Sequence, residues 1–282
     1  MQTNLLIAIK NIVTKPILDI ASYYKAHNRI NNVGESLEMY IKDIFCNSLD
    51  LDMGEKLIKY KNNFSYLGNQ NNPPDIMIKS GDAIEVKKIE NFKLAIALNS
   101  SYPKDKIYNT SPMITASCKM CEQWNEKDLI YIIGVVKKEI LKSLWFVYGD
   151  CYSANREIYE RIKNKITSGL SEINDIELSE TNEIGRVNKI DPLGITYLRI
   201  RGMWGIDNPV RVFDYITTLN QKNTFTLSVL ILKNKYLSFP KVDRDNLEKL
   251  SNNDFKITDV KIKSPNNPAI LLNAKFISFV IK

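Results

Sequence analysis

The sequence contains a single histidine, His27, among its 282 residues. Histidine is the general base of Ser-His-Asp triads and the commonest ligand of catalytic transition metals. A triad would therefore have to use His27, and sites built on paired histidines are excluded. Any catalysis is expected to depend on carboxylates, lysine and a metal ion that prefers oxygen ligands.

Cysteine is also scarce, with four residues at positions 46, 118, 121 and 151. Cys118 and Cys121 form a lone CxxC within ITASCKMCEQW, a segment that we expect to be helical. A structural zinc site usually needs two such pairs, and the second pair is missing here. A zinc site from Cys118, Cys121, Cys151 and His27 is an alternative, but reduced and buried thiols are the favoured interpretation.

No apolar run reaches the roughly 20 residues that a membrane-spanning helix requires. The first residues, MQTNLLIAIKNIVTK, have neither a basic region before the apolar stretch nor a small-residue cleavage site, so they indicate an amphipathic helix. Internal repeats, low-complexity tracts and long linkers are absent as well. We therefore expect a cytoplasmic protein with one domain over residues 1–282.

Positive charge is in excess, with 39 Lys and Arg against 32 Asp and Glu, which gives a net charge of +7. Such an excess favours a polyanionic partner such as nucleic acid. Many basic proteins bind no polyanion, so the charge alone leaves both possibilities open.

The hydrophobic periodicity predicts an α/β or α+β sandwich, in which helices flank a mixed β-sheet; the α/β class is the one that we expect. Apolar residues at helical spacing predict helices over residues 3–26 (interrupted at Pro16), 34–47, 155–168 and 210–219. Short β-rich runs predict strands over residues 75–78, 83–89, 129–136, 144–148, 195–201, 225–232 and 275–281.

The stretch PPDIMIKSGDAIEVKKIE, residues 73–90, places charged residues inside an apolar strand pattern. Side chains two apart in a strand share a face, so Glu85 and Lys87 are expected to project together. If the two strands pair through the Ser80-Gly81 turn, Asp75 comes close to Glu85. Two carboxylates and one ammonium group would then meet at one end of a sheet.

This combination suits metal-dependent hydrolysis of a phosphodiester. Mg²⁺ is usually held by one or two carboxylates, with water and phosphate as the other ligands. The metal lowers the pKa of a bound water, and the lysine can orient that water and oppose the charge that develops on the phosphate. The alternative is structural, because Glu85 and Lys87 could form a solvated ion pair on one strand face.

The helix expected at 34–47 offers a third acid. Its apolar face is centred near Leu37, Ile41 and Ile44, and Glu38 lies at the border of that face. Glu35 points nearly opposite, into solvent. We therefore expect Glu38 to reach the site, where it would bind a second metal or position a water; an ion pair with Lys42 is the equal alternative.

Pro74-Asp75 followed by Glu85-Val86-Lys87 resembles the signature of the PD-(D/E)xK nucleases. The wider runs FSYLGNQNNPPDIMIKSGDAIEVKKIE, ALNSSYPK and GRVNKIDPLGITYLRIRGMW are similar to those of the NgoPII-like type II restriction endonucleases. The resemblance covers most of the chain and is more specific than the catalytic triplet alone.

This resemblance implies a restriction-endonuclease-like fold with a catalytic core over about residues 30–150. It implies a bacterial enzyme that uses Mg²⁺ to cut both strands of DNA at the palindrome GGCC. It also implies a homodimer, because a two-fold symmetric site matches a two-fold symmetric protein, and a cognate DNA methyltransferase in the same system. Asp75 and Glu85 become metal ligands and Lys87 the water-orienting base, whereas the role of Glu38 depends on the helix geometry alone.

Base recognition is expected within about residues 180–235. Arg and Lys are the side chains that best reach guanine O6 and N7, and an acid can accept a hydrogen bond from cytosine N4. The candidates in this segment are Arg186, Asn188, Lys189, Asp191, Arg199 and Arg201. Arg199 and Arg201 would share one face if residues 195–201 form a strand, and phosphate contacts or surface ion pairs are the alternative for all six.

The segment after the catalytic strand contains Ser100, Ser101 and Lys104, whose small polar groups and positive charge suit phosphate contacts. It could equally be an ordinary turn. For the whole chain, two other functions stay open: a repair or mobile-element nuclease without a palindromic site, and a basic DNA-binding protein without catalysis.

Overall fold

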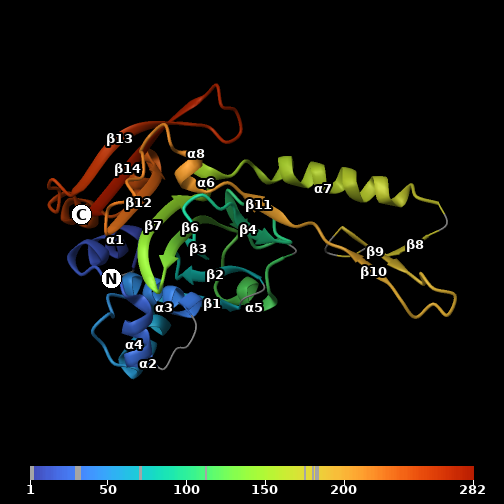
Figure 1. Cartoon of the computed structure of the whole chain (residues 1–282), viewed down its shortest axis with the longest axis horizontal. Coiled ribbons are helices and arrows are strands. Elements are labelled where there is room, and N and C mark those ends of the chain that lie inside the picture. Colours follow the sequence, from blue (N-terminus) through green and yellow to red (C-terminus); the bar gives the residue numbers. More distant parts are fainter. Residues whose placement is uncertain are drawn as a thin grey trace.

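The computed structural model describes residues 3–28, 33–69, 72–111, 113–174, 176–179, 181 and 184–282, the side chains of residues 26–28, 33 and 69 excepted. A large mixed β-sheet forms its centre (Figure 1). The strands of this sheet lie in the order β1 (Phe64–Asn69), β2 (Asn72–Ile78), β3 (Ala83–Ile89), β6 (Glu126–Lys137), β7 (Ile140–Tyr148), β12 (Phe225–Leu232), β14 (Leu271–Ile281) and β13 (Phe255–Lys263), and β5 (Lys106–Tyr108) pairs with β6.

The sheet is mixed because β3 and β7 each have one parallel and one antiparallel neighbour. Strand β3 pairs antiparallel with β2 and parallel with β6, in a register that runs from Ala83 opposite Leu129 to Ile89 opposite Val135. Strand β7 pairs antiparallel with β6 and parallel with β12. Together with the helices around it, this sheet confirms the fold class expected from the sequence.

Four helices from the N-terminal part of the chain lie beside the sheet (Figure 1): α1 (Leu5–Thr14), α2 (Ile20–Asn28), α3 (Val33–Cys46) and α4 (Met53–Asn63). Helix α3 packs on β3 and buries Leu37, Ile41 and Ile44. It can approach closely because Gly134 of β6 has no side chain: a Cβ there would lie 2.6 Å from Leu37 Cδ2. The glycine thus brings α3 down onto the strands that carry the predicted site.

The C-terminal strands are covered by α9 (Lys233–Ser238), and α10 (Lys241–Glu248) packs against α1. Two further short helices are α5 (Ala116–Met120) and α6 (Gly149–Tyr152). None of the helices in the described part of the chain is long and apolar enough to cross a bilayer.

A long arm projects from this body (Figure 1). The arm, residues 156–201, consists of α7 (Arg156–Ser171) and a small sheet of β8 (Glu177–Ser179), β9 (Gly185–Asn188) and β10 (Leu198–Ile200). The chain then returns to the body through β11 (Trp204–Ile206), which pairs antiparallel with β4 (Ile96–Asn99).

Two expectations from the sequence are wrong in extent. Residues 195–201 contribute only β10, because Asp191 accepts hydrogen bonds from the Leu193 and Thr196 N–H groups and holds the preceding segment as a loop. Residues 210–219 contribute only the end of α8 (Pro209–Val212). The chain continues there as turns, and Phe213 stacks on buried Trp145 with ring centroids 6.1 Å apart.

Candidate active site

Asp75 and Glu85 face each other where strands β2 and β3 stop pairing. The register ends at Ile76 opposite Ile84, so the next position on each strand is Asp75 and Glu85. There the Val86 N–H donates to Asp75 Oδ2 at 2.6 Å. The carboxylate therefore accepts from the neighbouring strand itself, which fixes its orientation beside Glu85.

Gly68 of β1 allows this arrangement. A Cβ at Gly68 would collide with the Pro74 carbonyl oxygen and would lie 3.1 Å from Asp75 Cα. Because both obstacles are backbone atoms, they could move only by displacing Asp75. The sequence analysis assigned no role to this glycine, since the close approach depends on the β1–β2 pairing.

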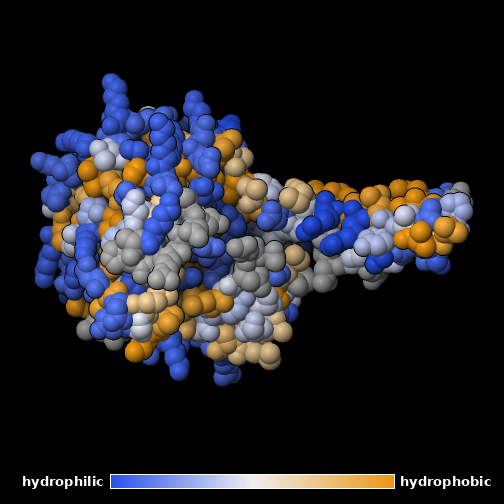
Figure 2. All heavy atoms as spheres, turned by 60° about the horizontal axis from the view of Figure 1, so that its bottom comes forward, coloured by the Kyte–Doolittle hydropathy of each residue, from blue (hydrophilic) through white to orange (hydrophobic). Residues whose placement is uncertain are grey.

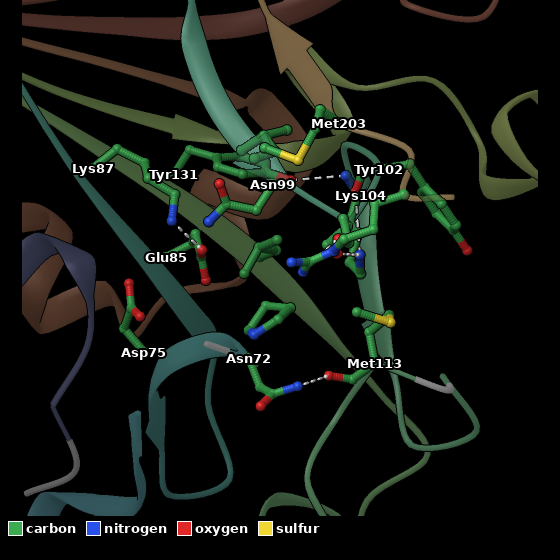
Figure 3. A pocket seen from close by; sticks show the side chains of 16 residues that line it. Asn72, Asp75, Glu85, Lys87, Asn99, Tyr102, Lys104, Met113, Tyr131 and Met203 are labelled. Carbon is green, nitrogen blue, oxygen red and sulfur yellow. Dashed lines mark hydrogen bonds and ion pairs between the residues drawn. The ribbon is translucent and has the colours of Figure 1, made fainter. Parts of the chain in front are cut away.

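Lys87 lies on the same face of β3 as Glu85, as the strand alternation predicted. Its Nζ forms an ion pair with Glu85 Oε1 at 2.6 Å (Figure 3). The next residue, Lys88, is exposed and pairs instead with Glu90 at 3.1 Å. The three residues Asp75, Glu85 and Lys87 therefore meet in space, although the Glu85–Lys87 pair is largely buried and not solvated.

The electrostatics of the three groups are coupled. Burial, and next the negative charge of Glu85, raise the pKa of Asp75 to about 8, against the opposing effects of Lys87 and the Val86 N–H. Burial lowers the pKa of Lys87, but Glu85 and Asp75 more than offset this, so the pKa of Lys87 lies above its ordinary value. Ionising both carboxylates would thus give the site more negative charge than its own lysine neutralises.

Within the described part of the chain, Glu85 Oε2 is a buried acceptor with no hydrogen-bond partner. Leaving such an atom unsatisfied is costly, so Oε2 is suited to ligate a cation or to accept from a donor of the substrate. The site opens into a cavity of about 380 Å³ lined by Asp75, Glu85 and Lys87 (Figure 3). A Mg²⁺ ion held by these two carboxylates, with water and phosphate as further ligands, fits this donor set.

The structure offers two protein ligands at this point and not a complete cage. Among the described residues, no group of three or more His, Cys, Asp or Glu side chains is placed to hold a metal ion. Sites for Mg²⁺ with one or two carboxylates are common where the substrate supplies phosphate oxygens. The arrangement therefore matches a metal that binds together with a phosphate-containing substrate.

Glu38 faces this site from α3. It is partly buried, whereas Glu35 on the same helix is exposed, as the helix geometry predicted. The negative charge of Glu38 contributes to raising the pKa of Asp75 and the pKa of Lys87. Glu38 on α3 therefore interacts electrostatically with both of these residues on the sheet. Among the ion pairs of the described residues, none joins Glu38 to Lys42.

Ser100, Ser101 and Lys104 line the same cavity. Lys104 is buried, and its Nζ donates to Ser101 Oγ and, at 3.1 Å, to the Tyr102 carbonyl oxygen. Burial lowers the pKa of Lys104 to about 8, although Glu85 nearby acts in the opposite direction. A second lysine thus lies at the cavity that Asp75, Glu85 and Lys87 line, more deeply buried than its place after a strand suggested.

Tyr131 of β6 was not among the residues predicted from the sequence. It lines the cavity, and its hydroxyl accepts the backbone N–H of Lys104 at 2.7 Å. The apolar run LIYIIGVV concealed it, because a tyrosine there is indistinguishable from other core residues. Its contact with Lys104 ties the Ser100–Lys104 segment to the central sheet.

Arg201 also reaches the cavity, and one of its Nη atoms donates to Ser100 Oγ at 3.2 Å. It lies beyond the end of β10, so it does not share a strand face with Arg199. The β4–β11 pairing brings Arg201, the last residue of the arm, back beside the body, whereas Arg199 lies within the small sheet of the arm.

The other predicted DNA-binding residues lie on the arm, and most of them contact the arm itself. Asn188 Nδ2 donates to Ser179, and Lys189 pairs with Glu177 at 2.8 Å. The Arg186 guanidinium lies 3.8 Å from the ring centre of Tyr197. Asp191 organises its own loop, and a hydrogen bond from Thr196 is the main cause that lowers the pKa of Asp191 to about 2.

The cysteines lie elsewhere and are all free thiols. Cys118 Sγ contacts Met77 Sδ at 3.1 Å, and Cys121 Sγ contacts the same sulfur at 3.9 Å. Burial is the main cause that raises the pKa of Cys118 to about 12, so this thiol stays protonated. The side chain of His27, the fourth member of the alternative zinc site, lies outside the described residues.

A mixed sheet flanked by helices, with two carboxylates and a lysine at the end of a hairpin, defines a restriction-endonuclease-like protein. A model of the NgoPII restriction endonuclease family matches residues 3–263. The chain is 48% identical over 277 residues to the type II restriction enzyme NgoPII of Neisseria gonorrhoeae. The aligned region covers 98% of this chain and 99% of that enzyme. No solved structure matches the chain. The chain belongs to the NgoPII restriction endonuclease family and is a type II restriction enzyme.

Proposed function

We propose that the chain cleaves both strands of DNA at the palindrome GGCC in a reaction that depends on Mg²⁺. The observation that carries the metal requirement is the unpartnered, buried Glu85 Oε2 beside Asp75, in a cavity open to a substrate. The palindrome rests on the likeness of the chain to the NgoPII family.

Asp75 and Glu85 would hold the metal ion, which lowers the pKa of a bound water and neutralises charge on the phosphate. Lys87 is positioned by Glu85 to donate to the attacking water or to a phosphate oxygen. Its raised pKa keeps it protonated while both carboxylates are free. Lys87 can therefore orient water as a donor in that state, and it can accept a proton only when its negative neighbours are neutralised.

The wall opposite these residues is suited to the DNA backbone. This wall of the cavity carries hydrogen-bond donors and no carboxylates, and it consists of Arg201, Ser100, Ser101 and Lys104. Such donors position the phosphate without reading sequence. We assign these four residues to DNA contact and Glu38 to positioning a water or a second metal ion.

The partners follow from the symmetry of the target. A two-fold symmetric site calls for a homodimer with one active site per strand. We propose this assembly, a single domain over residues 1–282 and a catalytic core over about residues 30–150. A bacterial cytoplasmic setting with a cognate DNA methyltransferase, which makes no direct contact, completes the proposal.

Digestion of a plasmid of known sequence with and without Mg²⁺ tests this function. Discrete fragments that map to GGCC sites are expected with Mg²⁺, and intact plasmid without it. Smearing or random nicking would instead indicate a nuclease without a palindromic site. A gel shift in Ca²⁺ with no cutting in Mg²⁺ would indicate a DNA-binding protein without catalysis.

A further inference from the structure

Helix α7 of the arm has no buried residue along its sixteen positions. The side chains of Ile158, Ile162 and Ile166 are spaced by four residues and therefore form one stripe. They are 40%, 41% and 47% exposed. A helix of this length normally depends on burial of its apolar face for stability, so the stripe lacks the partner that its sequence calls for.

The contacts that attach α7 to the rest of the chain use the neighbouring face. The Tyr159 ring stacks on Tyr102 with centroids 5.5 Å apart, and Thr167 Oγ1 donates to the Ile184 carbonyl oxygen. Within the described residues, these contacts leave the isoleucine stripe uncovered. It is thus free to meet another molecule while α7 keeps its attachment.

Apolar exposure continues along the arm (Figure 2). Ten of the 22 large apolar side chains that are exposed in the described chain lie within residues 156–201, and Leu193 and Ile195 are exposed by 81% and 73%. The other members beyond α7 are Ile173, Ile176, Ile190, Tyr197 and Leu198. Gathering of this kind on one projecting element indicates a protein interface.

The charge of the arm argues against a polyanion as its main partner. Residues 156–201 contain eight Lys and Arg and eight Asp and Glu, so the entire excess of +7 lies outside the arm. The stretch of sequence that follows α7, residues 172–183, has five acids and no basic residue. Such a segment is repelled by DNA and attracted by the basic body of another copy of this chain.

We propose that the apolar face of the arm is the surface on which a second copy of this chain docks. The inference deepens the proposed function, because it assigns the homodimer to a particular surface. In a two-fold assembly both arms are used in the same way, so one substitution on the stripe weakens the interface twice.

Sedimentation velocity of the full chain tests the proposal. The native chain is expected to sediment at twice its 32.4 kDa mass, and Ile162→Glu at the mass of one chain, with at least about 100-fold weaker association, because a charge would be buried without a partner. The double variant Ile158→Ser with Ile166→Ser is expected to weaken association in the same direction. A native-like circular dichroism spectrum and one cooperative melting transition would show that both variants fold, since loss of the dimer by itself lowers the melting temperature.

Ile58→Glu is the matched control. Ile58 lies on α4, outside the arm, and is 63% exposed, so the same change there is expected to leave the dimer intact. If Ile162→Glu stays dimeric, the arm is not the interface, although the homodimer itself would stand. A native chain that sediments as a monomer would overturn both the arm interface and the homodimer.

A DNA-binding measurement in Ca²⁺ distinguishes a second copy of the chain from DNA as the partner of the isoleucine stripe. If Ile162→Glu remained a dimer but lost affinity for DNA, the stripe would contact DNA and the proposal would be wrong. Sedimentation requires neither metal nor cleavage. A failure to cut GGCC therefore leaves the outcome for the arm unaffected.

Discussion

The Val86 N–H donates to Asp75 Oδ2 at 2.6 Å, at the point where the β2–β3 backbone register has ended. A carboxylate that substitutes for a backbone acceptor has a fixed orientation, and this one is fixed beside Glu85. Burial and the Glu85 charge raise the pKa of Asp75 to about 8, so the two carboxylates are ionised together more readily when a cation lies beside them.

Removing either carboxylate charge is expected to abolish cleavage without abolishing DNA binding. Asp75→Asn and Glu85→Gln keep the size of each side chain but should lower the cleavage rate at least about 100-fold. The measurement is plasmid cleavage in Mg²⁺ beside a gel shift in Ca²⁺. Glu90→Gln is the control, because Glu90 is exposed and pairs only with Lys88 among the ion pairs of the described residues. Cleavage at the native rate by Glu85→Gln would contradict the metal-ligand role.

Lys87 and Lys88 are adjacent lysines on opposite faces of β3, which makes them a matched pair. Lys87→Met should lower the cleavage rate at least about 100-fold, because the ammonium group that Glu85 positions would be lost. Lys88→Met should cleave at the native rate. The measurement is single-turnover cleavage of a GGCC duplex, and equal rates for the two variants would exclude a catalytic role for Lys87.

Glu38→Gln should slow cleavage less than the Asp75 and Glu85 variants, by about tenfold or more. The reason is that Glu38 acts through its charge from α3, which raises the pKa of Asp75 and of Lys87. The rate is to be measured over a range of Mg²⁺ concentrations, where a higher requirement for Mg²⁺ is expected. Glu35→Gln, an exposed change on the same helix, should match the native enzyme at every concentration.

Lys104 gives a prediction on stability and pH. Because burial lowers its pKa to about 8, the folded chain binds fewer protons than the unfolded chain between pH 8 and the ordinary lysine value. The free energy of unfolding therefore rises with pH across that window. Below the window, the folded chain bears the full free-energy cost of burying the charged Lys104 ammonium group. Lys104→Met removes this cost, so its free energy of unfolding relative to the native chain should be higher at pH 7 than at pH 10, by up to about 3 kcal/mol.

Urea denaturation at pH 7, 8, 9 and 10 measures the effect. Lys106→Met is the control, because a hydrogen bond to Glu126 is the main cause that raises the pKa of Lys106. The stabilisation that comes with a raised pKa is lost only above the ordinary lysine value, so Lys106→Met should show almost no pH trend between pH 7 and 10. A difference between Lys104→Met and the native chain that does not vary with pH would show that Lys104 is not buried as a charged group.

Binding to DNA should weaken steeply with added salt, because each neutralised phosphate releases counterions. Arg201→Ala should reduce the slope of log K against log salt by about one, as expected for one lost phosphate contact. Arg211→Ala is the control, since Arg211 is exposed on α8 and pairs with Asp207 at 3.5 Å. Fluorescence anisotropy in Ca²⁺ gives both slopes, and identical slopes for Arg201→Ala and the native chain would remove Arg201 from the phosphate footprint.

The hairpin that carries Asp75, Glu85 and Lys87 was predictable from the sequence because its determinants are local. Alternation within residues 83–89 places Glu85 and Lys87 on one face, and the Ser80-Gly81 turn brings Asp75 back toward them. The side of α3 that carries Glu38 follows from helical periodicity in the same way. These features need no knowledge of distant segments.

The features that sequence did not predict depend on tertiary contacts. Arg199 and Arg201 are two residues apart, yet one stays on the arm and the other reaches the cavity, because β11 pairs with β4. The helix expected at 210–219 ends early, where Phe213 packs on Trp145. The isoleucine spacing predicted α7, but periodicity cannot tell whether an apolar face meets the same chain or another molecule.

The parallel pairing of β3 with β6 has a consequence for the chemistry as well as for the sheet. A slip of one residue between these strands would turn every β3 side chain to the opposite side. Glu85 and Lys87 would then be driven among apolar neighbours, while Val86 and Lys88 would take their places at the cavity. The continuous register from Ala83 to Ile89 therefore keeps Glu85 and Lys87 on the side of the sheet that faces the cavity.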